Sequence, residues 1–184
     1  MRGRAFLSTR ELVAFGAGGL TTLALVSLGP LHARVVPSAS MAPTLMPGDR
    51  LAILDAKPPT PARGEIVVFH APFKALPGEP ASPKGPFAEE PLYIKRVVGL
   101  PGDTVAVIPG RGVRVNGHLL AEPYVQAHAR YAWGPAAIPS GRVFVLGDNR
   151  NDSFDSHHWG LLPVSRIVGR PAALFWPPRR TRLF

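Results

Sequence analysis

An uncharged apolar run near the N-terminus constrains the fold of this 184-residue chain more than any other feature. Residues 12–31 contain no Asp, Glu, Lys or Arg and are long enough to cross the hydrocarbon core of a membrane as one helix. Three arginines and one glutamate precede the run, so the positive-inside rule predicts residues 1–11 in the cytoplasm and residues 34–184 outside. A cleavable secretory signal is the alternative, but the run is longer than the apolar core of such signals. The sequence therefore predicts a single retained anchor.

Short apolar segments follow the run, and many begin just after a turn that contains glycine. Their length, alternation and flanking turns are typical of β-strands. The predicted strands are Leu51–Asp55, Ile66–His70, Tyr93–Val98, Thr104–Ile108, Gly112–Val115 with His118–Leu120, Val143–Leu146 and Ile167–Trp176. Asn116-Gly117 predicts a two-residue hairpin turn. We expect a mostly β domain over residues 34–184, folded as a coiled, partly open β-barrel or as packed antiparallel sheets.

Composition predicts one loop and limits the kinds of partner that the chain can bind. Residues 71–91 hold six prolines, which prevent regular strand pairing and predict a loop. The net charge of +9 is scattered apart from short clusters at both ends, so no nucleic-acid partner is expected. The basic tail, residues 179–182, follows the aromatic stretch 175–178 and predicts contact with anionic membrane lipid, with a frayed tail as the alternative. The absence of cysteine excludes disulfides and a thiol nucleophile.

Two serines lie two residues apart just beyond the apolar run, in the segment Pro-Ser-Ala-Ser-Met-Ala-Pro-Thr-Leu at residues 37–45. In an extended chain the side chains of Ser38 and Ser40 point to the same side. One hydroxyl could then attack a carbonyl group while the other donates a hydrogen bond to the oxyanion that forms. The alternative is an ordinary turn in which the hydroxyls cap backbone groups.

A serine nucleophile needs a base, and no histidine has a carboxylate partner fixed by local spacing. Only four of the 21 basic residues are lysines, and Lys95 alone lies in an apolar strand-like segment. Arginine stays protonated, whereas a buried lysine can lose its proton. Lowering its pKa from about 10.4 to 7 or 8 costs roughly 3 to 5 kcal/mol, which burial can impose. A strand lysine whose ammonium reaches solvent is the alternative.

A third cluster of polar residues occupies positions 147–160, Gly-Asp-Asn-Arg-Asn-Asp-Ser-Phe-Asp-Ser-His-His-Trp-Gly, directly after an apolar strand. Arg150 stands where a calcium-binding loop requires Asp or Asn. His157 and His158 are adjacent and are not spaced to bind one metal ion from a helix face. We therefore expect no metal, and interpret the cluster as a polar network beside a Ser-Lys dyad.

In this order the three clusters resemble those of bacterial type I signal peptidases (leader peptidases), the membrane-bound Ser-Lys serine proteases of peptidase family S26. The similarity covers residues 37–50, 64–70, 93–105 and 143–172. It implies an endopeptidase without a cofactor, anchored in the bacterial cytoplasmic membrane with its catalytic domain on the outer face. The implied reaction removes signal peptides from exported preproteins through an acyl-enzyme.

The resemblance also implies roles for individual residues. Ser40 would be the nucleophile and Lys95 the general base, while the Ser40 amide and the Ser38 hydroxyl would form the oxyanion hole. Ser153 would hold the lysine ammonium, and Asp155 would support that serine.

Further positions carry the resemblance less directly. Asp148 and Arg96 would form a structural ion pair, and four residues would lie near shallow pockets for small substrate side chains: Met41, Leu45, Tyr93 and Ile94. His157 stands where many relatives have arginine, which puts the charge support around Asp155 in question. The alternatives are a dedicated processing peptidase of the same family, such as one that matures a pilin for conjugation, or an inactive membrane-tethered binding module. The oligomeric state is not predicted.

Overall fold

The computed structural model describes residues 31–55, 61–72 and 91–184. The predicted cytoplasmic segment, the predicted anchor up to residue 30 and most of the proline-rich loop lie outside the described residues. Within those three ranges, no helix is long and apolar enough to cross a membrane. Leu31, the last residue of the predicted span, begins strand β1 instead.

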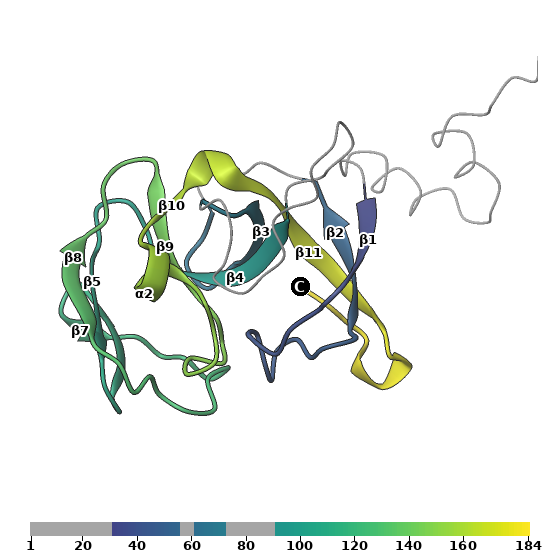
Figure 1. The fold of residues 1–184 in the computed structure, drawn as a ribbon, viewed down its shortest axis with the longest axis horizontal. Helices are drawn as coiled ribbons and strands as arrows, with labels where there is room; N and C mark the ends of the chain where they lie inside the picture. The colour runs from purple at the N-terminus through teal and green to yellow at the C-terminus, as the bar shows by residue number, and fades with distance from the viewer. Residues whose placement is uncertain (1–30, 56–60, 73–90) are drawn as a thin grey trace, which may run out of the picture.

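The larger sheet contains eight strands and curls around one end of the molecule (Figure 1). Its order is β1-β2-β11-β3-β4-β9-β10, with β12 paired to β11, and every pairing is antiparallel. Strand β11 pairs with β2 through its C-terminal part and with β3 through its N-terminal part. The strands are β1 Leu31–Val35, β2 Arg50–Leu54, β3 Ile66–His70, β4 Leu92–Gly99, β9 Arg142–Leu146, β10 Leu162–Pro163, β11 Ile167–Trp176 and β12 Arg182–Leu183.

The smaller sheet has four antiparallel strands in the order β7-β6-β5-β8 and lies at the opposite end of the molecule (Figure 1). Its strands are β5 Thr104–Ile108, β6 Gly112–Val115, β7 His118–Leu119 and β8 Trp133–Ala137. Val115 pairs with His118 across the predicted two-residue turn. Asn116 and Gly117 have φ angles of 50° and 83°, the left-handed conformation that this turn requires.

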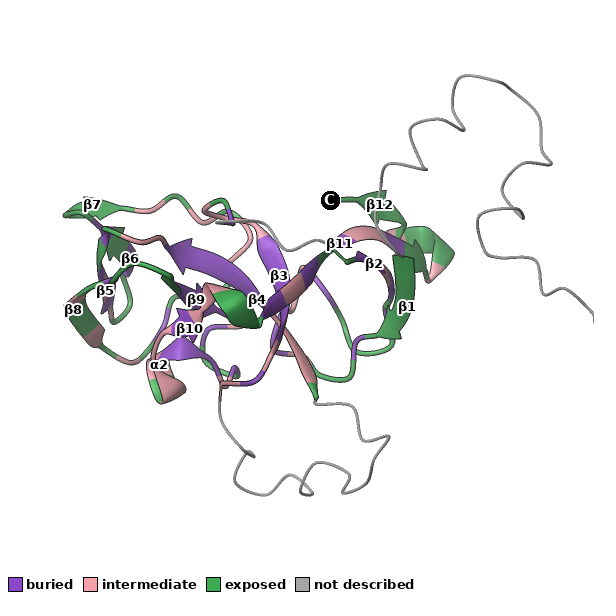
Figure 2. Ribbon diagram, turned by 90° about the horizontal axis from the view of Figure 1, so that it is seen from above, coloured by how far each residue is buried: buried purple, intermediate pink, exposed green. Residues whose placement is uncertain are grey.

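Strand β4 lies between β3 and β9 near the centre of the larger sheet, where Figure 2 shows the most deeply buried strands. Its last five residues, Lys95–Gly99, are all buried. A strand covered on both faces puts successive side chains into two different interior environments. This position makes the strand a suitable carrier for a desolvated amine.

The sequence-based prediction of a mostly β, antiparallel fold is confirmed, while the segment predicted to form the membrane helix lies outside the described residues except for Leu31. Each predicted strand is present with ends within one or two residues of those expected. Strands β1, β8, β10 and β12 were not predicted from the sequence. It also missed three short helices: α2 Ser156–Trp159, and the 3-10 helices η1 Val164–Arg166 and η2 Pro178–Arg180.

Candidate active site

The structure brings Ser40 and Lys95 into direct contact. Lys95 Nζ lies 2.7 Å from Ser40 Oγ, across 55 positions in the sequence. Ser40 comes from the segment between β1 and β2, and Lys95 comes from β4. The two residues are 8% and 4% exposed. A hydroxyl this close to an amine can pass its proton directly to that amine.

The environment of Lys95 favours the neutral amine. Burial lowers the pKa of Lys95 from 10.5 to about 8, although the nearby carboxylates of Asp155 and Asp148 raise it. The ammonium form makes two hydrogen bonds, to Ser40 Oγ and to the Ile94 carbonyl oxygen at 3.1 Å. Burial therefore prepares Lys95 to act as a base near neutral pH.

Ser38 lies beside Ser40, although residues 38–45 form bends and turns and not the extended chain on which the prediction was based. Ser38 Oγ is 3.2 Å from Ser40 Oγ. No acceptor among the described residues takes the Ser40 amide N–H. The hydroxyl of Ser38 and the amide of Ser40 are thus two donors beside the attacking oxygen, as an oxyanion hole requires.

A loop of residues 147–155, here called the catalytic loop, follows β9 and holds the main chain of the nucleophile. The Asn149 amide donates to the Ser40 carbonyl at 3.1 Å, and Asn149 Nδ2 donates to the Ala39 carbonyl at 3.2 Å. Gly147 packs so closely here that a Cβ atom would overlap the Ser40 carbonyl oxygen and Ser153 Oγ. Only glycine allows the catalytic loop to approach this near.

Ser153 and Asp155 both lie at the dyad, but their contacts differ from those implied by the resemblance. Ser153 lines the same cavity as Lys95, yet its buried hydroxyl has no hydrogen-bond partner among the described residues. Asp155 Oδ2 accepts from the Gly147 amide at 2.9 Å. Asp155 therefore fixes the catalytic loop, and its charge acts on Lys95 through space.

His157 takes the second oxygen of Asp155. His157 Nδ1 lies 2.6 Å from Asp155 Oδ1, and its ring stacks on Tyr131 with the centroids 3.7 Å apart. Asp155 also caps helix α2 by accepting from the His157 amide at 3.2 Å. An imidazole thus supports this carboxylate at the position where the resemblance led us to expect an arginine.

Arg96 and Asp148 form an ion pair on the opposite side of β4 from Lys95. Arg96 Nε donates to Asp148 Oδ1 at 2.8 Å, and Nη2 donates to Oδ2 at 2.7 Å. Arg96 Nη1 also donates to the Gly64 carbonyl at 2.7 Å, and its guanidinium lies 3.8 Å from the Tyr124 ring centroid. The bidentate pair ties the start of the catalytic loop to the strand that carries the base.

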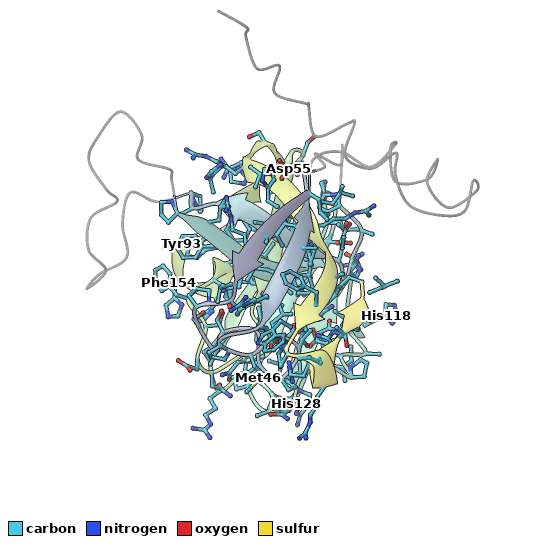
Figure 3. The ribbon with its side chains drawn as sticks, turned by 90° about the vertical axis from the view of Figure 1, so that its right-hand side faces the viewer. Met46, Asp55, Tyr93, His118, His128 and Phe154 are labelled. Atoms are coloured by element: carbon cyan, nitrogen blue, oxygen red, sulfur yellow. The ribbon has the colours of Figure 1, made fainter. Side chains whose placement is uncertain are left out.

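Two hollows flank the dyad. A cavity of about 800 Å³ contains Ser38, Ser40, Lys95 and Tyr93 in its walls. A groove of about 310 Å³ lies between the segment 34–37 and the residues of β4 before Lys95, including Tyr93. Figure 3 shows Tyr93 on the same side of the molecule as Phe154, which also lines the larger cavity.

The four residues expected near substrate pockets divide into two groups. Tyr93 and Ile94 line the groove. Met41 and Leu45 are fully buried, and pack in the hydrophobic core with Ile94 at its margin. The structure thus places two of them at the surface of the groove and two in the core beside it.

Structural contacts of Glu122, Arg150 and Arg180 were not expected from the sequence, which predicted only a lipid contact for the tail that contains Arg180. Arg150 pairs with Glu122 through two hydrogen bonds. Arg180, from the basic tail, donates to Asp49 and to the carbonyl oxygens of residues 43 and 44, just after the nucleophile. No local pattern signals these partners, because they lie far apart in the sequence.

The chain has clear relatives among known proteins. The profile of the family described as "Signal peptidase, peptidase S26" matches residues 9–176. A signal peptidase I from Leptolyngbya laminosa is 46% identical over 151 residues, which cover 81% of this chain and 70% of the relative. A probable signal peptidase I-2 from a Synechocystis strain is 44% identical over 154 residues, which cover 83% of this chain and 66% of the relative.

A solved structure of a signal peptidase I from Enterococcus faecalis aligns with 60% of this chain and 95% of its own, at 26% identity and a TM-score of 0.42. The family profile spans most of the chain, including Ser40, Lys95 and the whole catalytic loop. The chain therefore belongs to the signal peptidase family of serine endopeptidases, peptidase family S26.

Proposed function

We propose that this chain removes N-terminal signal peptides from exported preproteins, with Ser40 and Lys95 as its catalytic dyad. The contact of 2.7 Å between Lys95 Nζ and Ser40 Oγ, inside the domain, carries this proposal. Burial lowers the pKa of Lys95 to about 8, which suits a general base. Folding does not explain this contact, because a buried lysine lowers the stability of a fold unless its charge is balanced.

The reaction follows from the positions of the donors and the base. Ser40 Oγ attacks the carbonyl carbon of the scissile bond while Lys95 accepts its proton. The Ser40 amide and the Ser38 hydroxyl donate hydrogen bonds to the tetrahedral oxyanion. The lysine ammonium then gives its proton to the leaving amine, and a water molecule activated by Lys95 hydrolyses the ester. Ser153, with its unsatisfied hydroxyl, accepts the third ammonium N–H during this cycle.

The groove beside β4 suits the residues that precede the cut. Its walls come from two extended segments, residues 34–37 and 91–94, between which a substrate can lie in extended conformation. Met41 and Leu45 are fully buried in the core beside the groove and support its apolar wall through Ile94. A volume of about 310 Å³ shared by several substrate residues leaves space only for small side chains.

The membrane has two proposed roles. The apolar run up to residue 30 anchors the domain on the outer face of the bacterial cytoplasmic membrane, which raises the effective concentration of preproteins held in the same bilayer. Exposed apolar side chains also lie at both ends of β1, with Leu31 57% and Val35 60% exposed, and near Val35 lie Phe175 and Trp176.

We infer that the sheet edge around β1 rests along the membrane surface. The basic tail contributes less unbalanced charge than the sequence predicts, because Arg180 forms an ion pair with Asp49, while Arg182 donates to the neutral Thr44 carbonyl and keeps its charge. Anionic lipid remains the proposed partner through the arginines near that edge, such as Arg34.

The test is cleavage of a preprotein that is embedded in lipid vesicles with the full chain. Ser40→Ala and Lys95→Ala should each abolish turnover, and N-terminal sequencing of the wild-type product should locate the cut after a small residue. Ser165→Ala is the matched control, because Ser165 is exposed and lies outside both hollows. Turnover that persists in either dyad variant would refute the proposal.

A further inference from the structure

The connector between β7 and β8, residues 120–132, packs along the catalytic loop although it supplies no member of the dyad. Its Glu122 forms a bidentate ion pair with Arg150 of the loop. Arg150 Nη1 donates to Glu122 Oε2 at 2.8 Å, and Nη2 donates to Oε1 at 2.5 Å. The side chains of Arg150 and Glu122 are 0% and 2% exposed. This is a fully buried pair of charges beside the active site.

A further bond of Arg150 leads toward the nucleophile. Arg150 Nε donates to the Gly147 carbonyl at 3.0 Å, and the Gly147 amide donates to Asp155. Two residues later, the Asn149 amide donates to the Ser40 carbonyl. Arg150 therefore holds the carbonyl group of Gly147, two residues before the amide of Asn149 that bonds to Ser40.

The connector holds the catalytic loop and α2 at two further places. Asn151 Nδ2 donates to the His128 carbonyl at 3.1 Å, and the Arg130 amide donates to Asn151 Oδ1 at 2.8 Å. The ring of Tyr131 stacks on His157 at an interplanar angle of 8°. These contacts keep the connector in register with the loop, so Glu122 meets Arg150 in one defined geometry.

Stability alone does not explain why the chain buries this pair. Removing two charges from water often costs as much free energy as their attraction returns, and apolar replacements of similar size are often neutral or stabilising. An apolar pair cannot donate a hydrogen bond to the Gly147 carbonyl. Arg150 also lines the cavity that contains Ser40 and Lys95.

We propose that Glu122 is a positioning residue for the cleavage reaction. By binding both outer nitrogens of Arg150, its carboxylate fixes the direction of the Nε–H that holds Gly147. The Gly147–Asn149 segment in turn holds the Ser40 main chain in the geometry needed for proton transfer to Lys95. The inference rests on the proposed function, and Glu122 itself touches neither the dyad nor the substrate.

The test compares kcat, KM and melting temperature of the full chain in detergent, with a preprotein as substrate. Glu122→Gln should lower both the melting temperature and kcat, because it leaves Arg150 buried without a counter-charge. The double variant Glu122→Leu with Arg150→Met should restore the melting temperature, while kcat stays about 100-fold below wild type with KM within about twofold, as expected for misplaced reacting groups. Recovery of kcat together with the melting temperature would overturn the proposal.

Two further variants keep the test decisive if Glu122→Gln fails to fold. Arg150→Lys keeps a cation for Glu122 but loses the bond to Gly147, so kcat should fall about tenfold or more with KM unchanged; wild-type kcat would overturn the proposal. The matched control is Asp103→Asn, which weakens an ion pair of 2.8 Å with Arg63. Within the part of the chain that the structure describes, neither residue bonds to the catalytic loop, so this variant should lower the melting temperature without changing kcat.

A wild-type chain that does not cleave the preprotein would remove the proposed function and this inference together. An active wild type with a fully active double variant would remove the inference alone.

Discussion

Replacing Lys95 with methionine should stabilise the fold while abolishing cleavage. Burial lowers the pKa of Lys95 from 10.5 to about 8, against the opposing charges of Asp155 and Asp148. The residue is only 4% exposed, so solvent screens this effect little. At about 1.36 kcal/mol per pKa unit, keeping the ammonium protonated in the fold costs about 3 kcal/mol at pH 7. Loss of the amine's hydrogen bonds to Ser40 and Ile94 removes about 1 kcal/mol, which leaves a net gain of about 2 kcal/mol.

The pH dependence of this gain follows from which state binds the proton. The amine of Lys95 loses its proton near pH 8 in the folded chain and near pH 10.5 in the unfolded chain. Between these values the unfolded state binds more protons, so the stability of the wild type rises with pH. The penalty is fully present below pH 8 and has disappeared above pH 10.5. The advantage of Lys95→Met should therefore be largest at pH 7 and absent at pH 10.5.

The assay is urea unfolding of the full chain in mild detergent, followed by tryptophan fluorescence at both pH values. Arg111→Met, which also replaces a cation but at an exposed turn, should change stability by less than about 0.5 kcal/mol at either pH. No gain for Lys95→Met at pH 7, or the same gain at both pH values, would refute the reasoning that an unbalanced buried charge lowers the stability of this domain.

Three further outcomes are expected. The kcat/KM of the wild type should fall tenfold per pH unit below about pH 8, since only the neutral Lys95 amine accepts a proton; a rate that is unchanged down to pH 6 would contradict this. Gly147→Ala should reduce kcat at least tenfold and lower the melting temperature, because the new Cβ would overlap Ser153, and a variant with wild-type values would argue against the close approach. Asp148→Asn should lower the free energy of unfolding by about 3 to 5 kcal/mol in urea titrations, because Arg96 then stays buried without its partner; a loss below 1 kcal/mol would be inconsistent with this.

The strands that could be predicted have a regular apolar pattern and a turn marked by glycine. Strand β1 lacks this signal because all five of its residues are exposed at a sheet edge, and it continues directly from the apolar run. Strand β8 contains Gly134 and Pro135, which indicate a turn in the sequence, whereas here they lie at the edge of the smaller sheet. Helix α2 has only four residues, too few for any helical periodicity.

The reactive residues could be predicted from local sequence segments, whereas the residues that hold them in place could not. Ser38, Ser40 and Lys95 belong to short segments whose residue types suit one reaction, and the structure brings all three together. Glu122 lies in an irregular connector, and its contact with Arg150 depends on how the smaller sheet packs against the larger one. Such a contact is a property of the tertiary structure, and no local sequence pattern encodes it.

The alternation of side chains along β4 predicts which insertions and deletions this strand can accept. Lys95 and Arg96 are neighbours in the chain but meet different partners, Ser40 on one side of the strand and Asp148 on the other. A single-codon deletion in this strand before Lys95 would move Arg96 to the position of Lys95, presenting to Ser40 a guanidinium that cannot accept its proton, and a single-codon insertion there would move Lys95 away from Ser40. The number of residues in β4 upstream of the base should therefore stay fixed relative to β3 and β9.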